Sequence, residues 1–262
     1  MSAPQGVVRT DNNGRILYYA RNGTTIRDLR KHGVAVTYSQ LEILSHWSLL
    51  RNDGQTYKTA FPVITPEQAI ALRGELAVLA RLITPSIGAD VKDIRQQLRR
   101  NGFEDHTYTI IFSYVLDGLL WEKLFSPKDL QLLEVTRDHP FWNGAFYAVY
   151  PKRVGVPGTN DVSEDGITFK MLWIDRTVGT LNALGSSAAL KTFLDSVAKN
   201  QIDPTPIHLT NGATWELARP DGRLLIPVID QGKGDLIQTR GDRIATRIAH
   251  VLRRDPSSIA VS

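Results

Sequence analysis

The sequence predicts an α+β protein in which a largely helical first part is followed by a part that alternates helices with short antiparallel strands. Two observations carry this prediction. Helical patterns dominate up to about residue 125, and after Ser126-Pro127 the pattern changes to the alternation typical of strands. We therefore expect two domains, residues 1–128 and 129–262, because 262 residues are enough for two separate cores.

The composition is that of a folded protein, with 42% hydrophobic and 22% charged residues. The absence of cysteine excludes disulfides, cysteine-ligated zinc and thiol nucleophiles. The first residues show no basic segment followed by an apolar run, and charges interrupt the most apolar windows. We therefore expect a cytoplasmic protein without a membrane span.

The positive charge is concentrated in one segment near the end of the chain. The net charge is +4, from 31 basic and 27 acidic residues. Residues 240–254 hold five arginines against Asp242 alone, which gives 5 − 1 = +4 and leaves 26 basic and 26 acidic residues elsewhere. This basic helix is a candidate for contact with phosphate or with an acidic partner.

Local signals define the first elements. Residues 7–20 are apolar on both sides of a turn signal at 11–14 and predict a hairpin. Thr24 or Thr25 caps a short helix that ends at Gly33. Thr37 and Gln40 then have the spacing of a capping box. The helix that follows has Leu41 and Leu44 on one stripe, with Ile43 and Trp47 beside it.

A second hairpin is predicted over residues 51–64, with its turn at Asp53-Gly54, and Pro66 then opens a helix from about 67 to 83. Pro85 and Gly88 separate that helix from the next one. The later predicted elements are helices at 90–102, 104–124, 186–200 and 241–254, strands at 146–153, 166–175, 206–210, 214–218 and 223–229, and a long loop at 155–166.

The order of helix, capped helix and hairpin over residues 25–64 resembles the second half of a winged helix-turn-helix domain. The resemblance implies that the capped helix enters the major groove and that the hairpin contacts the backbone. Residues implied to face bases are Tyr38, Ser39, Glu42, Ser45 and His46, and those implied to contact phosphate are Arg51, Asn52 and Lys58. The sequence departs from the pattern in two ways: the reading helix has no Arg or Lys, and Glu42 repels phosphate. A glutamate can, however, accept a hydrogen bond from the N4 amino group of cytosine.

In the last helix, Arg243, Arg247 and Arg254 recur at i, i+4 and i+11 and predict a stripe that follows phosphates. The alternative is a solvated face with arginines near the helix C-terminus, where the helix dipole favours cations. Phe146 and Tyr150 share one strand face, where they either stack on unpaired bases or pack in a core.

The stretch "RPDGRLLIPVI" at 219–229 repeats landmarks of "RNDGQTYKTAFPVI" at 51–64. A duplicated reading module requires a capped helix before the second stretch. Pro204, Pro206 and Gly212 leave no room for one. We interpret the echo as turn chemistry used twice.

Signals for an enzyme are sparse, since the common zinc, serine-hydrolase and phosphate-loop motifs are missing. Asp138, His139, Asp161, Glu164 and Asp165 would form an acid-base or metal site near the 155–166 loop if the fold brought them together. We predict neither cofactor nor metal. The leading hypothesis is a regulatory protein that binds double-stranded DNA, as in control of transcription. The alternatives are a protein-interaction module that uses the same surface, and an enzyme or small-ligand binder with its site near the 155–166 loop.

Overall fold

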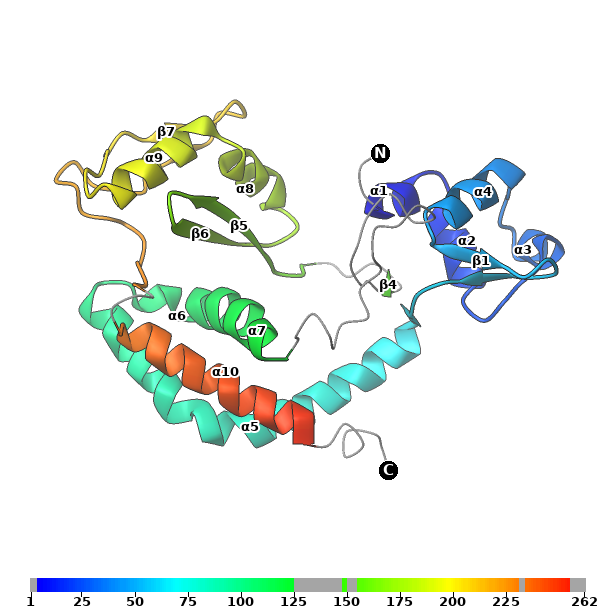
Figure 1. Cartoon of the computed structure of the whole chain (residues 1–262), viewed down its shortest axis with the longest axis horizontal. Helices are drawn as coiled ribbons and strands as arrows, with labels where there is room; N and C mark the ends of the chain where they lie inside the picture. Colours follow the sequence, from blue (N-terminus) through cyan, green and yellow to red (C-terminus); the bar gives the residue numbers. More distant parts are fainter. Residues whose placement is uncertain (1–3, 125–147, 150–154, 231–233, 255–262) are drawn as a thin grey trace. The chain divides into compact units, whose positions relative to one another are not determined.

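The computed structural model describes residues 4–124, 148–149, 155–230 and 234–254 (Figure 1). The described residues form two compact units, one of residues 4–76 with 148–149 and one of residues 77–124, 155–230 and 234–254. The mixture of helices with small, mostly antiparallel sheets is that of the expected α+β class. The boundary predicted near residue 128 lies outside the described residues, and residues 77–124 group with the later part of the chain.

The first unit begins with α1 (Pro4–Arg9) and α2 (Asn13–Tyr19), so the hairpin predicted over residues 7–20 is wrong. Ile16, Leu17 and Ala20 are fully buried, and their i, i+1, i+4 spacing fits a helix face. The buried Asn13 side chain donates to the Val7 carbonyl at 2.9 Å, which ties the two helices together. Apolar runs on both sides of a polar turn suit a helix pair as well as a hairpin.

The next two helices, α3 (Ile26–Lys31) and α4 (Tyr38–His46), confirm the predicted caps. The Thr25 hydroxyl accepts from the Asp28 backbone N–H at 3.1 Å, and Gly33 lies at a φ of +68° just beyond the helix end. At the start of α4 the Thr37 hydroxyl accepts from the Gln40 N–H at 3.2 Å, and the Gln40 side chain accepts from the Thr37 N–H at 3.0 Å.

The predicted hairpin follows as β1 (Leu50–Asn52) and β2 (Tyr57–Thr59), which pair antiparallel. The Asp53 carboxylate accepts from the Gln55 and Thr56 N–H groups, and Gly54 takes a φ of +91°. Thr24 bridges Tyr57 on the other edge of β2. β3 (Val63–Ile64) pairs in parallel with β4 (Ala148–Val149). The fully buried core residues of this unit are Val7, Ile16, Leu17, Ala20, Leu29, Val34, Leu44 and Leu49.

One helix, α5 (Pro66–Arg100), replaces the two helices predicted on either side of Pro85 and Gly88. Pro85 lacks the backbone N–H that would donate to the Arg81 carbonyl in a regular helix, yet α5 continues through it. Burial of Ile83, Ile94 and Leu98 along one face holds the later part of the helix in place. The packing of this face therefore keeps the helix continuous across Pro85, although a proline usually ends or kinks a helix.

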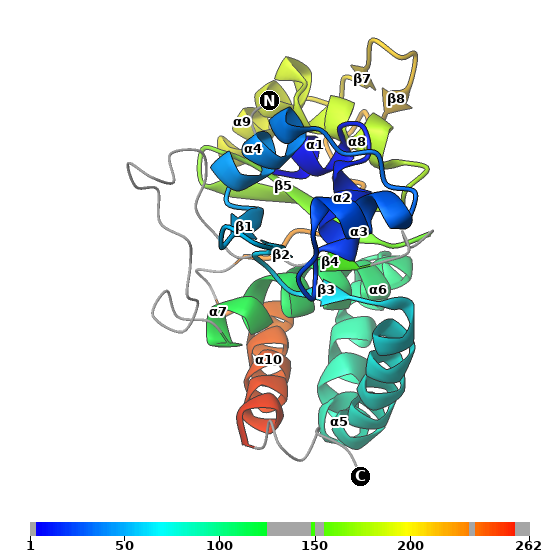
Figure 2. The same ribbon diagram turned by 90° about the vertical axis from the view of Figure 1, so that its right-hand side faces the viewer.

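The helical layer of the second unit packs around α5. It comprises η1 (Glu104–His106), α6 (Thr107–Thr109), the π-helix η2 (Ile110–Leu119), α7 (Leu120–Leu124) and α10 (Leu236–Arg254). α10 lies beside the later half of α5 in both views (Figures 1 and 2). Their shared core contains Ile94, Leu98, Tyr114, Val115 and Ile244.

The rest of the second unit is a long hairpin of β5 (Gly158–Glu164) and β6 (Ile167–Trp173), with α8 (Val178–Gly185), α9 (Ala188–Ala198), β7 (Ile207–His208) and β8 (Thr214–Trp215). The predicted strand at 166–175 is confirmed by β6, and the predicted helix at 186–200 by α9 with its Ser187 cap. The loop predicted at 155–166 is wrong, because most of it forms β5. The strand predicted at 223–229 is reduced to one bridge between Ala218 and Leu224.

No helix in the described part of the chain combines the length and the apolarity that a membrane span requires.

Candidate nucleic-acid interface

The outward side of α4 carries most of the residues implied to face bases. We call Tyr38, Ser39, Glu42, Ile43 and His46 the α4 outer face, since all five are exposed. Leu41 and Leu44, on the opposite side of the helix, are buried in the core. Ser45 is half-buried at the margin. The structure therefore brings four of the five predicted residues onto one exposed surface.

Two members of the α4 outer face, Tyr38 and Ile43, are large apolar side chains that are exposed to solvent. Tyr38 is 74% exposed and Ile43 is 46% exposed. The spacing of residues predicts that Ile43 lies beside the buried stripe of α4. In the structure, about half of its side chain is exposed to solvent. A half-exposed Ile next to a carboxylate is available for contact with a partner.

The β1–β2 hairpin presents two cations together. Arg51 and Lys58 are register partners on adjacent antiparallel strands, so their side chains leave the same face of the hairpin. Both are exposed, and neither forms an ion pair with another described residue. Like charges placed directly opposite one another disfavour the hairpin, and an anion bound between them removes that cost. Asn52 has a different role, because its side-chain oxygen accepts from the Gly54 N–H at 2.9 Å and holds the turn.

The first unit carries a net positive charge. A comparison of residues 240–254 with all the other residues together hides this excess, because acidic residues elsewhere in the chain balance it. Residues 4–76 contain nine basic and six acidic residues, a net charge of 9 − 6 = +3. Two of the acids are held ionised by internal hydrogen bonds. The Thr25 hydroxyl, then Lys31, lowers the pKa of Asp28, and the Thr56 and Gln55 backbone amides lower the pKa of Asp53. A charge count over the unit itself, rather than over residues 240–254 and all the others, finds this excess.

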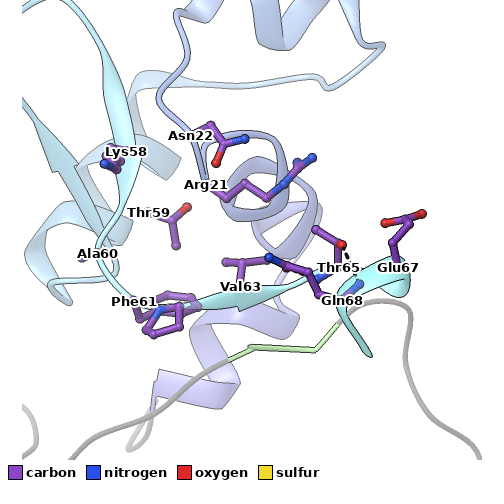
Figure 3. A pocket seen from close by; sticks show the side chains of 11 residues that line it. Arg21, Asn22, Lys58, Thr59, Ala60, Phe61, Val63, Thr65, Glu67 and Gln68 are labelled. Carbon is purple, nitrogen blue, oxygen red and sulfur yellow. Dashed lines mark hydrogen bonds between the residues drawn. The ribbon is translucent and has the colours of Figure 1, made fainter. Parts of the chain in front are cut away.

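An open basin of about 570 Å³ lies between the end of α2, β2 and the first turn of α5 (Figure 3). Arg21, Asn22 and Lys58 are among the residues that line it. Arg21 is held in place, since its guanidinium donates to the Tyr18 carbonyl at 2.8 Å and lies 4.3 Å from the centre of the Tyr18 ring. Glu67 lines the basin on the same side as Arg21, so the basin itself is not uniformly basic.

The arginines of α10 do not form the free stripe that their spacing predicts. Asp90 of α5 is 2% exposed, and the guanidinium groups of Arg247, Arg243 and Arg240 approach its carboxylate at 2.8, 3.3 and 3.4 Å. Arg247 also donates to the Ser86 carbonyl. These side chains neutralise a buried carboxylate and join α10 to α5. Arg254 ends the helix, and its side chain lies outside the described residues.

The acidic residues near 155–166 are largely engaged with lysines. Lys170 contacts Asp161 at 2.7 Å, and Lys191 lies 3.9 Å from Glu164. A hydrogen bond to Asp195 raises the pKa of Asp165. Within the described ranges, no three His, Asp or Glu side chains gather as metal ligands. The other predicted members, Asp138 and His139, and the aromatic pair Phe146 and Tyr150, lie outside the described residues.

Comparison with known proteins adds no relative: no family model, no curated protein and no solved structure matches this chain.

Proposed function

We propose that the first unit is a winged-helix domain that binds double-stranded DNA in a regulatory role. In this proposal α4 enters the major groove, and the β1–β2 hairpin is the wing that contacts the phosphate backbone. The observation that carries the proposal is the Arg51–Lys58 pair, two adjacent cations without an acidic partner among the described residues, on a unit with an excess of positive charge.

The order of elements supports the fold part of the proposal. α2, α3 and α4 precede the hairpin, and the Thr24 bridge adds a short third strand segment beside β2. α4 has nine residues and is about 13 Å long. Glu42 on its outer face forms no ion pair with another described residue, and a B-DNA major groove about 12 Å wide admits one such helix.

The test measures the affinity for a mixed-sequence duplex at several salt concentrations, by fluorescence anisotropy with the full chain. The double variant R51A/K58A is compared with R100A/R176A, which removes two exposed arginines of the second unit. We expect the wild type and the control to bind with the same salt dependence. We expect R51A/K58A to bind more weakly, with a log-log salt slope lower by about 2. Absence of binding by the wild type at about 50 mM salt refutes the proposal.

A second candidate is a protein-interaction surface, favoured by the exposure of Tyr38 and Ile43. Exposed aromatic and aliphatic side chains beside a single charge suit a polypeptide partner. In that case the chain binds no duplex. It binds a protein partner in a manner that tolerates salt, and the Y38A/I43A variant no longer binds that partner. The two outcomes separate the candidates.

A further inference from the structure

We infer that Glu42 is a specificity-determining residue of the α4 outer face, which selects a base that offers an amino group in the major groove, cytosine above all. This inference rests on the proposed function, because it assigns the base that the DNA-bound helix reads. It assigns different effects to two parts of the first unit: the β1–β2 hairpin supplies affinity, and Glu42 supplies discrimination.

The position of Glu42 suits contact with a ligand. It lies between Tyr38 and His46 at i−4 and i+4, in the middle of the α4 outer face, and the buried Leu41 and Leu44 lie on the opposite side of the helix. Among the described residues, its carboxylate forms no hydrogen bond and no ion pair. The carboxylate therefore has no structural role in the fold that competes with a partner.

The chemistry of a carboxylate decides which base edge it accepts. An ionised carboxylate only accepts hydrogen bonds. In the major groove, guanine presents the acceptors N7 and O6 and thymine presents O4, whereas cytosine presents only the N4 amino donor. Adenine offers N6 next to the acceptor N7, which repels the second carboxylate oxygen. Cytosine is therefore the base that Glu42 favours.

The rest of the α4 outer face agrees with this assignment. It contains neither Arg nor Lys, the side chains that most often read guanine. Ile43, half-exposed on the next position of the helix, offers the apolar contact that suits the methyl group of thymine. A pyrimidine-rich strand is the target that this surface fits.

The negative charge of Glu42 has a second consequence. Close to a duplex it is repelled by phosphates, and this repulsion is offset only where an amino group meets the carboxylate. Removal of the charge should therefore raise the affinity for mixed-sequence DNA while it abolishes the preference for cytosine. A residue that merely supports the fold would lower the affinity for every sequence.

The experiment selects duplexes from a random pool with the full-length wild type and with the E42A, E42Q and E122Q variants. E122Q removes one exposed carboxylate of the second unit and serves as the charge-matched control. Affinities are then measured for the selected duplex and for versions in which the selected cytosine is replaced. Thermal melting followed by circular dichroism checks that each variant is folded.

We expect the wild type and E122Q to select a cytosine and to lose about tenfold in affinity when it is replaced. E42A should show no such loss and should bind mixed sequence at least as tightly. E42Q should shift the preference to adenine, which suits the donor and acceptor of an amide. If the wild type binds DNA but its preference is unchanged in E42A, this inference is wrong and the proposed function stands. If the wild type binds no duplex, the proposed function fails.

Discussion

The Asp90→Asn variant tests the role of the α10 arginines most directly. Asp90 is 2% exposed and is approached by Arg247, Arg243 and Arg240. Asparagine keeps the shape and one acceptor, but it removes the charge that all three guanidinium groups share. If these arginines hold α10 against α5, the second unit loses stability.

The size of the effect follows from distance and exposure. The contact of 2.8 Å to Arg247 is a full charge-assisted hydrogen bond, whereas those of 3.3 and 3.4 Å to the other two arginines are weaker. The arginine side chains remain 27–47% exposed and can turn to water, so no buried cation is stranded. The cost is therefore below the roughly 3–5 kcal/mol of a stranded buried charge, and we expect about 2 kcal/mol.

The assay is denaturant unfolding of the full chain, with a thermal melt as a second measure. For a unit of this size, about 2 kcal/mol corresponds to a decrease in Tm of roughly 4–8 °C. The matched control is Asp93→Asn, because Asp93 is half-exposed and contacts only Arg240 among the described residues, at 2.9 Å. It should cost less than about 1 kcal/mol.

A double-mutant cycle of Asp90→Asn with Arg247→Ala isolates the pair itself. We expect a coupling free energy of at least about 1 kcal/mol. Equal destabilisation by the Asp90 and Asp93 variants, or a coupling near zero, would refute the reasoning and would leave Arg243 and Arg247 available for the phosphate-following stripe that their spacing predicts.

Three further predictions concern acid stability, strand packing and helix capping. A hydrogen bond from Arg99 holds the pKa of Glu104 at about 2, below its ordinary 4.5, so this contribution to stability is present above pH 4.5 and is lost as the pH falls toward 2. E104Q should therefore flatten the decrease of stability over that range in acid titrations, and an NMR midpoint of Glu104 near 4.5 would contradict the assignment. A Cβ at Gly158 would lie 2.3 Å from the Trp173 ring, so Gly158→Ala should cost about 1–3 kcal/mol and shift the tryptophan fluorescence; unchanged melting would exclude the close approach. Thr37→Ala should lower the free energy of unfolding of the first unit by about 1 kcal/mol, and a change below about 0.3 kcal/mol would mean that the capping box is dispensable.

The elements predicted well are those defined by neighbours in the chain. Thr25, Thr37 and Ser187 cap their helices through hydrogen bonds that close within three residues. Asp53 and Gly54 form their turn in the same way. Because such contacts require no distant partner, the spacing of the residues alone specifies them. For the same reason, the hairpin and the capped helix of the candidate interface were predicted from the sequence.

The errors arose where tertiary packing, rather than the local pattern, selects the structure. Residues 7–20 suit a hairpin or a pair of helices, and the burial of Ile16, Leu17 and Ala20 selects the helices. Pro85 signals a break, yet the apolar face of α5 that packs on its neighbours keeps the helix continuous. At Pro85, the free energy of packing exceeds the local cost of a proline inside a helix, about 3 kcal/mol.

The sequence by itself determined the helix caps, the hairpin turn and the presence of a basic final helix. Only the tertiary structure decided what the charges do. It pairs Arg243 and Arg247 with Asp90, more than 150 positions earlier in the chain, and it leaves Arg51 and Lys58 side by side without an ion pair to any described residue. The physical reason is that electrostatic interactions depend on distance and burial in space, and the spacing of charges along a chain does not contain either quantity.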